Sequence, residues 1–128
     1  MGRYSQLILE AHQLARPIQS SASCKAGGVA AVIVADSGQH FSGICVEFAC
    51  SLGFCAEHAA AAEMLKHHES KVTLVVAVDW SGKVLSPCGR CREMLWQLND
   101  ANRNALVILG PDVAKPLHEL LPSHWQDG

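Results

Sequence analysis

Aromatic side chains are scarce in this sequence, at 5% of its 128 residues. Apolar residues nevertheless make up 49% of the chain, so the core must be built from alanine, valine, leucine and isoleucine. That apolar content excludes an intrinsically disordered chain. The length predicts a single domain, 1–128, which can bury enough surface to fold without a covalent cross-link.

A surplus of basic residues is also absent. Ten lysine and arginine residues stand against twelve acidic residues, which gives a formal net charge of −2. Tight binding to a nucleic-acid backbone requires clustered positive charge, so we expect no nucleic-acid partner.

Long apolar runs are missing as well. No segment has the roughly 20 consecutive apolar residues that span a bilayer, so we expect no membrane partner. Residues 1–17 lack the apolar core and small-residue cleavage site of a secretory signal. The sixth residue is Gln6 rather than serine or threonine, which does not fit the N-myristoylation pattern. These absences predict a cytoplasmic protein.

Cysteine, by contrast, is plentiful. The six cysteines are Cys24, Cys45, Cys50, Cys55, Cys88 and Cys91. In a cytoplasmic protein, clustered cysteines indicate metal binding or redox chemistry more often than disulfides.

The pattern of apolar residues predicts alternating helices and strands. We expect helices at 5–15, 55–68, 87–98 and 115–121, and strands at 28–35, 39–46, 72–79 and 105–110. Residues 18–27 are predicted to be a polar connector, and Ser86 is predicted to cap the third helix. Strands that alternate with helices favour parallel pairing and a sheet covered on both faces. The predicted fold class is therefore α/β, a three-layer α/β/α sandwich with a mixed, roughly five-stranded sheet and an antiparallel hairpin at one side.

Two short stretches, "FCAEH" at 54–58 and "SPCGRC" at 86–91, contain the candidate chemistry. Cys88 and Cys91 are three residues apart on a predicted helix, so their side chains project from the same face. Cys55 and Cys88 lie at helix starts, where the backbone dipole favours thiolate over thiol. Three thiolates with one position left open form a candidate catalytic zinc site.

Glu57 follows Cys55 by two residues and is expected to reach into the cavity beside the metal. Zinc lowers the pKa of bound water to about 7 in a favourable protein site. A carboxylate next to that water can take its proton and pass it to a leaving amine.

The combination of "CAE" with "PCGRCR" resembles the cytidine deaminase superfamily, in its small three-cysteine branch, and the resemblance extends over nearly the whole chain. It implies Zn²⁺ as cofactor, with Cys55, Cys88 and Cys91 as ligands and Glu57 as the catalytic proton shuttle. It also implies conversion of a cytosine nucleoside, such as cytidine or deoxycytidine, to the uracil form with release of ammonia.

The same resemblance implies substrate contacts and an assembly. The backbone N–H of Ala56 is expected to contact the pyrimidine ring, and the carbonyl of Ser86 to accept a hydrogen bond from the displaced amine. Glu47 matches a residue that binds a ribose hydroxyl. The family further implies a homotetramer, in which Trp125 either closes a neighbouring subunit's site or packs on its own domain.

The sugar pocket departs from the family pattern. Cytidine deaminases carry Asn-x-Glu-Asn where this chain has "CVEF", so Cys45 and Phe48 replace two asparagines. Ala26 stands in place of a phenylalanine that flanks the nucleoside. His58 stands in place of an arginine beside the thiolates, and either His58 or Arg92 could offset their charge. Cys45 is thus a substrate-binding position whose identity predicts altered sugar recognition.

Three other interpretations remain open. "LSPCGRCREML" and "ELLPSHW" are similar to blasticidin S deaminases, which makes that antibiotic or another cytosine-like amino-heterocycle an alternative substrate. From a different class, a histidine such as His58 could complete a structural zinc site in a non-catalytic module. "CGRC" could also be a redox pair, although that leaves Cys55 and Glu57 unexplained.

Overall fold

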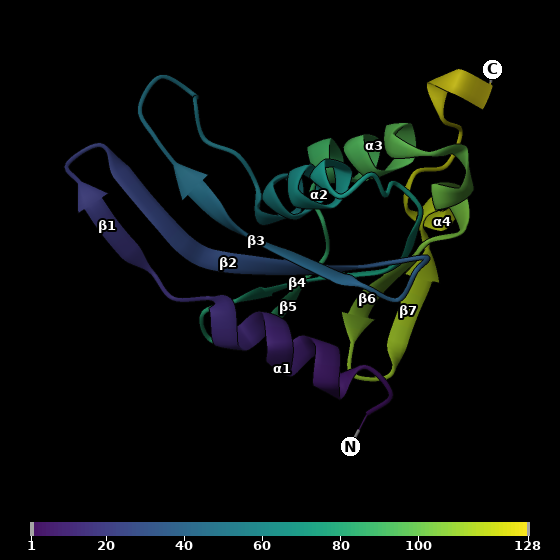
Figure 1. The fold of residues 1–128 in the computed structure, drawn as a ribbon, viewed down its shortest axis with the longest axis horizontal. Helices are drawn as coiled ribbons and strands as arrows, with labels where there is room; N and C mark the ends of the chain where they lie inside the picture. The colour runs from purple at the N-terminus through teal and green to yellow at the C-terminus, as the bar shows by residue number, and fades with distance from the viewer. Residues whose placement is uncertain (1, 128) are drawn as a thin grey trace.

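The computed structural model describes residues 2–127, and in that part of the chain a seven-stranded sheet forms the middle layer. Helix α1 (Ser5–Leu14) covers one face of the sheet, and α2 (Ala56–Lys66) and α3 (Gly89–Leu98) cover the other (Figure 1). This arrangement confirms the predicted three-layer α/β/α sandwich. None of the helices in this part of the chain is long and apolar enough to cross a bilayer.

The sheet is organised around one long strand, β2. The strands are β1 (Ile18–Ser21), β2 (Cys24–Ala35), β3 (His40–Glu47), β4 (Val72–Asp79), β5 (Val84–Leu85), β6 (Leu106–Gly110) and β7 (Val113–Pro116). Strand β2 pairs antiparallel with β1, β3 and β4. Strand β4 pairs antiparallel with β5 and parallel with β6, and β6 pairs antiparallel with β7. The short helix α4 (Leu117–Leu120) and two 3₁₀ helices, η1 (Asp100–Asn104) and η2 (Trp125–Asp127), complete the fold.

The sheet differs from the prediction in two ways. Among the described strands, parallel pairing is restricted to β4 and β6. The long strand β2 pairs antiparallel with β4 as well, although β3 and α2 lie between these two strands in the sequence. The sheet has seven strands where roughly five were predicted, and the four predicted strand ranges omit β1, β5 and β7. Strands β5 and β7 have two and four residues and are too short to show a periodic apolar pattern.

The prediction of a polar connector at 18–27 is wrong. Strand β1 and the first residues of β2 form an antiparallel hairpin there, with Ile18 opposite Ala26 and Ser21 opposite Cys24. All four residues of β1 are exposed. Main-chain hydrogen bonds rather than buried side chains stabilise this hairpin, so the apolar pattern contains no signal for it.

The predicted cap of α3 is also wrong. The helix begins at Gly89, and its N-cap residue is Cys88, whose backbone is extended. The hydroxyl of Ser86 accepts a hydrogen bond from Arg92 instead of capping the helix. Helix α2 begins at Ala56 with Cys55 as its N-cap residue. Both candidate metal-binding loops therefore end in a cysteine at the N-cap position.

Small side chains allow α2 to lie close to the sheet. A Cβ atom on Gly43 of β3 would lie 2.5 Å from both the Ala59 Cβ and the Ala60 nitrogen. Ala56 and Ala60 are completely buried at this contact. The alanine run of α2 thus fixes the distance between the helix start and the sheet edge, where the site lies.

Candidate metal and active site

Three cysteine side chains converge from two helix N-termini. Cys55 precedes α2, Cys88 precedes α3, and Cys91 lies in the first turn of α3. The Sγ atoms of Cys55 and Cys88 are 3.5 Å apart, and those of Cys88 and Cys91 are also 3.5 Å apart. The structure therefore brings together the three cysteines named from the sequence.

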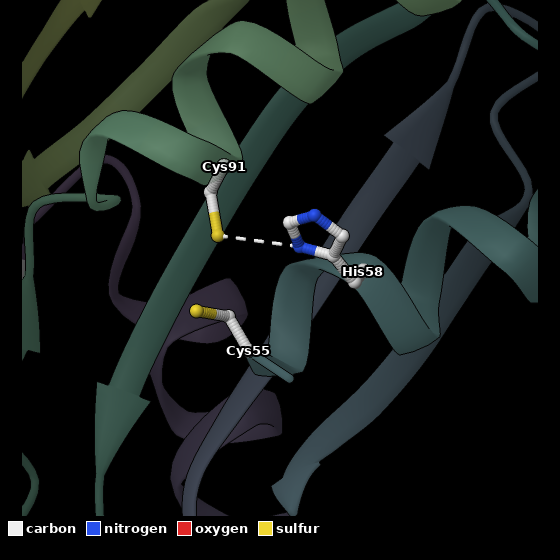
Figure 2. Close-up of side chains that lie close together, drawn as sticks. All are labelled: Cys55, His58 and Cys91. Carbon is white, nitrogen blue, oxygen red and sulfur yellow. Dashed lines mark hydrogen bonds between the residues drawn. The ribbon is translucent and has the colours of Figure 1, made fainter. Parts of the chain in front are cut away.

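His58 joins this cluster from the first turn of α2. Its Nδ1 atom lies 3.5 Å from the Cys91 Sγ atom (Figure 2). The donor atoms of Cys55, His58 and Cys91 all lie within 4.8 Å of one another and could hold a metal ion. Figure 2 shows these three side chains pointing toward a common centre between the two helices.

The spacing of these donors fits a tetrahedral zinc ion. A Zn–S bond of about 2.3 Å places two sulfur ligands about 3.8 Å apart, and a sulfur and a nitrogen ligand about 3.6 Å apart. The observed contacts of 3.5 Å need only a small outward movement to reach these values. Thiolate and imidazole are also the ligand types that zinc prefers.

Burial favours the neutral thiol at two of the three cysteines. Burial raises the pKa of the Cys91 thiol far above its ordinary value. Burial and the contact with Cys88 raise the pKa of Cys55. Burial also acts to raise the pKa of Cys88, but the backbone N–H of Cys91 and the thiol of Cys55 outweigh it, so this pKa is lowered. A divalent cation would favour ionisation of all three sulfurs and release their protons on binding.

Glu57 is a buried carboxyl beside the sulfurs, with 4% of its surface exposed. Burial raises its pKa, while hydrogen bonds from its own backbone N–H and from the Cys91 thiol act in the opposite direction. A carboxyl whose pKa lies above its usual range can both accept and return a proton near neutral pH.

A cavity of about 520 Å³ lies in front of the cluster. That volume is in the range of small-molecule sites, about 300–1,000 Å³. The predicted site residues that line it are Cys45, Glu47, Cys55, Ala56, Glu57, Ser86 and Cys88. Cys91 is completely buried behind the wall of the cavity. The structure therefore places every predicted catalytic, metal-binding and substrate-binding residue at or directly behind one cavity.

Arg90 is a cavity residue that the sequence analysis does not name. It lines the cavity from the start of α3 and donates a hydrogen bond to the Gly53 carbonyl at 3.4 Å. Burial is the main reason that the pKa of His58 is lowered, and the positive charge of Arg90 lowers it further. Its place between the two cysteines of "CGRC" is the only signal that could have indicated this position.

Arg92, which the sequence suggests as a residue that offsets the charge of the thiolates, makes its hydrogen bonds elsewhere. Its guanidinium donates to the Pro87 carbonyl at 2.8 Å, the Ser86 hydroxyl at 2.8 Å and the Leu120 carbonyl at 2.9 Å. It thus ties the loop before α3 to the end of α4.

Trp125 contacts its own chain through its indole N–H. Its indole donates a hydrogen bond to Glu93 of α3 at 3.2 Å, although 67% of its surface is exposed. The neighbouring His124 is buried and stacks on Trp96 with ring centroids 4.3 Å apart. The tail is therefore attached to the helix that carries Cys91, and Trp125 does not line the cavity.

Comparison with known proteins agrees with this geometry. The family model described as "Cytidine and deoxycytidylate deaminase zinc-binding region" matches residues 4–107. A cytidine deaminase of Mycobacterium tuberculosis (strain ATCC 25618 / H37Rv) is 33% identical over 95 residues, which are 73% of this chain and 69% of that protein.

Solved structures show the same similarity. The crystal structure of cytidine deaminase from Mycobacterium tuberculosis has a TM-score of 0.79 and 28% identity, covering 96% of this chain and 97% of that one. The cytidine deaminase from Bacillus anthracis has a TM-score of 0.74 and 28% identity, covering 96% and 89%. These matches confirm the superfamily predicted from "CAE" and "PCGRCR", and the chain belongs to the cytidine and deoxycytidylate deaminase zinc-binding family.

Proposed function

We propose that this protein is a zinc-dependent hydrolytic deaminase that converts a cytosine nucleoside, such as cytidine or deoxycytidine, to the uracil form with release of ammonia. The observation that carries this proposal is the convergence of three sulfur atoms and a buried carboxyl on one small-molecule cavity. Membership of the deaminase family supports it.

Cys55, Cys88 and Cys91 would hold the zinc ion, because Cys88 touches both other sulfurs and two of the three cysteines line the cavity. Zinc with one position open to the cavity activates water at neutral pH and acts as a Lewis acid. We assign His58 to a hydrogen bond from Nδ1–H to the Cys91 thiolate, since His58 does not line the cavity. A site in which His58 was a fourth ligand would be closed and structural.

Glu57 would carry the protons of the reaction. Its carboxylate would take one proton from the attacking water and give it to the ring nitrogen, and would then take the remaining hydroxyl proton and give it to the departing amine. The oxygen of the water remains as the new carbonyl of the product, and the amine leaves as ammonia. The burial that raises the pKa of Glu57 suits it to hold the proton between these transfers.

Backbone groups would orient the ring. Ala56 is the first residue of α2, where N–H groups have no partner within the helix and can donate to a ligand. The Ser86 carbonyl would accept a hydrogen bond from the amine that leaves, because Ser86 lines the cavity. Arg92 positions this carbonyl, because it binds both the Ser86 hydroxyl and the adjacent Pro87 carbonyl.

A second candidate substrate is a cytosine-like heterocycle with a modified sugar, such as blasticidin S. Cys45 favours it, because its Sγ atom already accepts a hydrogen bond from the Val29 N–H at 3.3 Å. A thiol in this position binds sugar hydroxyls more weakly than the amide of an asparagine would. Glu47 remains available at the cavity wall for a hydroxyl or an amine.

We also propose that the protein is a homotetramer in the cytoplasm. Phe48, Leu52 and Phe54 leave an exposed apolar rim beside the cavity. Such a patch fits burial against another subunit. Sedimentation equilibrium of the purified protein checks the assembly, and a monomer at micromolar concentration contradicts it.

The test of the function is ammonia release by the purified, zinc-loaded protein. The substrates are cytidine, deoxycytidine, cytosine and blasticidin S, and the zinc content is measured in the same samples. Turnover of cytidine or deoxycytidine supports the first candidate, and turnover of blasticidin S alone supports the second. One zinc ion per chain without turnover of any substrate contradicts both and favours the non-catalytic module.

A further inference from the structure

The C-terminal tail, residues 121–127, meets α3 at the carboxylate of Glu93. This carboxylate accepts hydrogen bonds from the Nε2 atom of His124, at 3.0 Å to one oxygen and 2.9 Å to the other. It also accepts the bond from the Trp125 indole at 3.2 Å. Glu93 follows Cys91 by two residues in the same helix. The tail is therefore bonded to the helix segment that carries a candidate metal ligand.

His124 is the anchor of this contact. Only 1% of its side chain is exposed, and its ring stacks on Trp96 with an interplanar angle of 18°. The backbone N–H of Gln126 donates a hydrogen bond to Nδ1 at 3.1 Å. Because a backbone N–H can only donate, Nδ1 accepts, and the ring proton lies on Nε2. A neutral His124 thus satisfies both of its ring nitrogens and donates to Glu93.

The other tail contacts are weaker than those of His124. Arg103 and Asp127 form an ion pair at 3.0 Å, but 41% and 43% of their side chains are exposed, and exposed pairs stabilise little in water. Ser123 has a φ of 53°, in the left-handed region that residues with a side chain rarely adopt. The buried bonds of His124 must outweigh this unfavourable backbone conformation to keep the tail in place.

Helix α3 connects the tail to the site. Arg92, the residue before Glu93, donates to the Leu120 carbonyl just before the tail. The same guanidinium donates to Ser86 and Pro87 in the loop before α3. Two consecutive residues of the helix are therefore bonded to the C-terminal segment, and one of them also holds the loop that lines the cavity. Close-packed protein interiors transmit such displacements because they compress little.

We propose that His124 is a positioning residue that acts through Glu93 to fix the start of α3. The start of this helix supplies Cys88 and Cys91 to the metal, and the loop before it supplies the Ser86 carbonyl. The inference rests on the zinc site of the proposed deaminase and adds to that site a residue from outside the cavity. Loss of the His124 bond should loosen the zinc ion and lower kcat. It should change KM less, because the predicted sugar-binding residues lie on β3.

Two substitutions of His124 separate its hydrogen bond from its packing. His124→Phe keeps a ring to stack on Trp96 but removes the donor to Glu93. His124→Gln keeps an N–H donor that can reach Glu93. His118→Phe is the matched control, because His118 is an exposed histidine on α4 in the same C-terminal segment.

The main measurement is the rate of zinc transfer from each zinc-loaded protein to an excess of a chromophoric chelator, at a temperature well below Tm. Tm is recorded for the same samples, together with kcat and KM for the substrate that the wild type turns over. A hydrogen bond to an ionised group shifts an equilibrium by roughly 10- to 100-fold, and only part of that effect reaches the metal. We therefore expect His124→Phe to release zinc about threefold to tenfold faster, with a similar fall in kcat and less than about a twofold change in KM. His124→Gln should restore both quantities to within about twofold of the wild type, and His118→Phe should behave like the wild type.

The variants also show how the inference could fail. A His124→Phe protein with a lower Tm but unchanged zinc release and kcat would mean that the tail only stabilises the fold, which refutes the positioning role. Equal impairment of His124→Gln and His124→Phe would refute it as well, because the hydrogen bond would not be the cause. If His124→Phe does not fold, Trp125→Phe decides, because it removes only the other tail donor to Glu93 at an exposed residue. Faster zinc release from Trp125→Phe supports the inference, and an unchanged rate refutes it.

The outcomes distinguish this inference from the proposed function. Faster zinc release from His124→Phe, in a protein whose wild type deaminates no cytosine compound, leaves the positioning role standing and refutes the deaminase. Turnover of cytidine by the wild type, with unchanged zinc release and kcat in His124→Phe, leaves the deaminase standing and refutes the positioning role. A wild-type protein that binds no zinc refutes both.

Discussion

Glu57→Gln is the substitution that tests the mechanism most directly. Glutamine has nearly the same shape as glutamate, so the 520 Å³ cavity and the sulfur cluster should remain. Only the ability to carry protons is removed. General acid–base catalysis contributes about 10²–10⁴-fold to a rate. Because Glu57 would serve each proton transfer, we expect kcat to fall by the largest factor in this range, about 10⁴-fold. That factor corresponds to an increase of about 5 kcal/mol in the activation barrier.

The assay combines ammonia release with zinc content. The variant should keep one zinc ion per chain and a KM for cytidine similar to that of the wild type. Glu63→Gln is the matched control, because Glu63 lies on the same helix, is half-buried away from the cavity, and pairs with Lys66 at 3.2 Å. The control should keep full activity. A Glu57→Gln protein with near wild-type kcat would refute the assignment of the proton shuttle.

Four further predictions concern the zinc site, the loops and stability. His58→Ala should lower the zinc affinity about 10- to 100-fold, as the loss of a hydrogen bond to a ligand does, whereas Cys91→Ser should lower it more. Competition with a chromophoric chelator measures both affinities, and an equal loss in the two variants would make His58 a ligand. In Arg92→Lys, the lysine cannot make the several hydrogen bonds by which Arg92 contacts the loop before α3 and the end of α4. We therefore expect kcat to fall about tenfold and Tm to drop in a thermal melt. An unchanged kcat would contradict the positioning role. Cys45→Asn should raise kcat/KM for cytidine about tenfold, and no change counts against the altered sugar site. Hydrogen bonds from Ser81 and Lys83 give Asp79 a folded-state pKa below its unfolded value, so its stabilising effect is present above the unfolded pKa and is lost as the pH falls through the folded pKa. Asp79→Asn should therefore lower Tm at about pH 7, and the difference in Tm should disappear as the pH falls through the folded pKa.

Local sequence determined the chemistry of the site. Cys88 and Cys91 share a helix face through their spacing alone, and "CAE" places Glu57 in the first turn after Cys55. Both relations depend on contacts within a few residues, which a sequence specifies directly. The buried runs of β2 and β4 determined the sandwich in the same way, because their apolar pattern is continuous.

Only the tertiary structure decided which groups from distant segments meet. His58 contacts Cys91 from 33 positions away, and Arg92 contacts Leu120 from 28 positions away. A second cavity, which shares part of its wall with the catalytic one, brings together residues from Pro17 to Leu85. The hairpin of β1 and the short strands β5 and β7 likewise depend on main-chain hydrogen bonds to partners elsewhere in the chain. Propensity and periodicity describe one segment at a time, so they determine the zinc-binding motifs but not the pocket around the substrate, which only the packed chain creates.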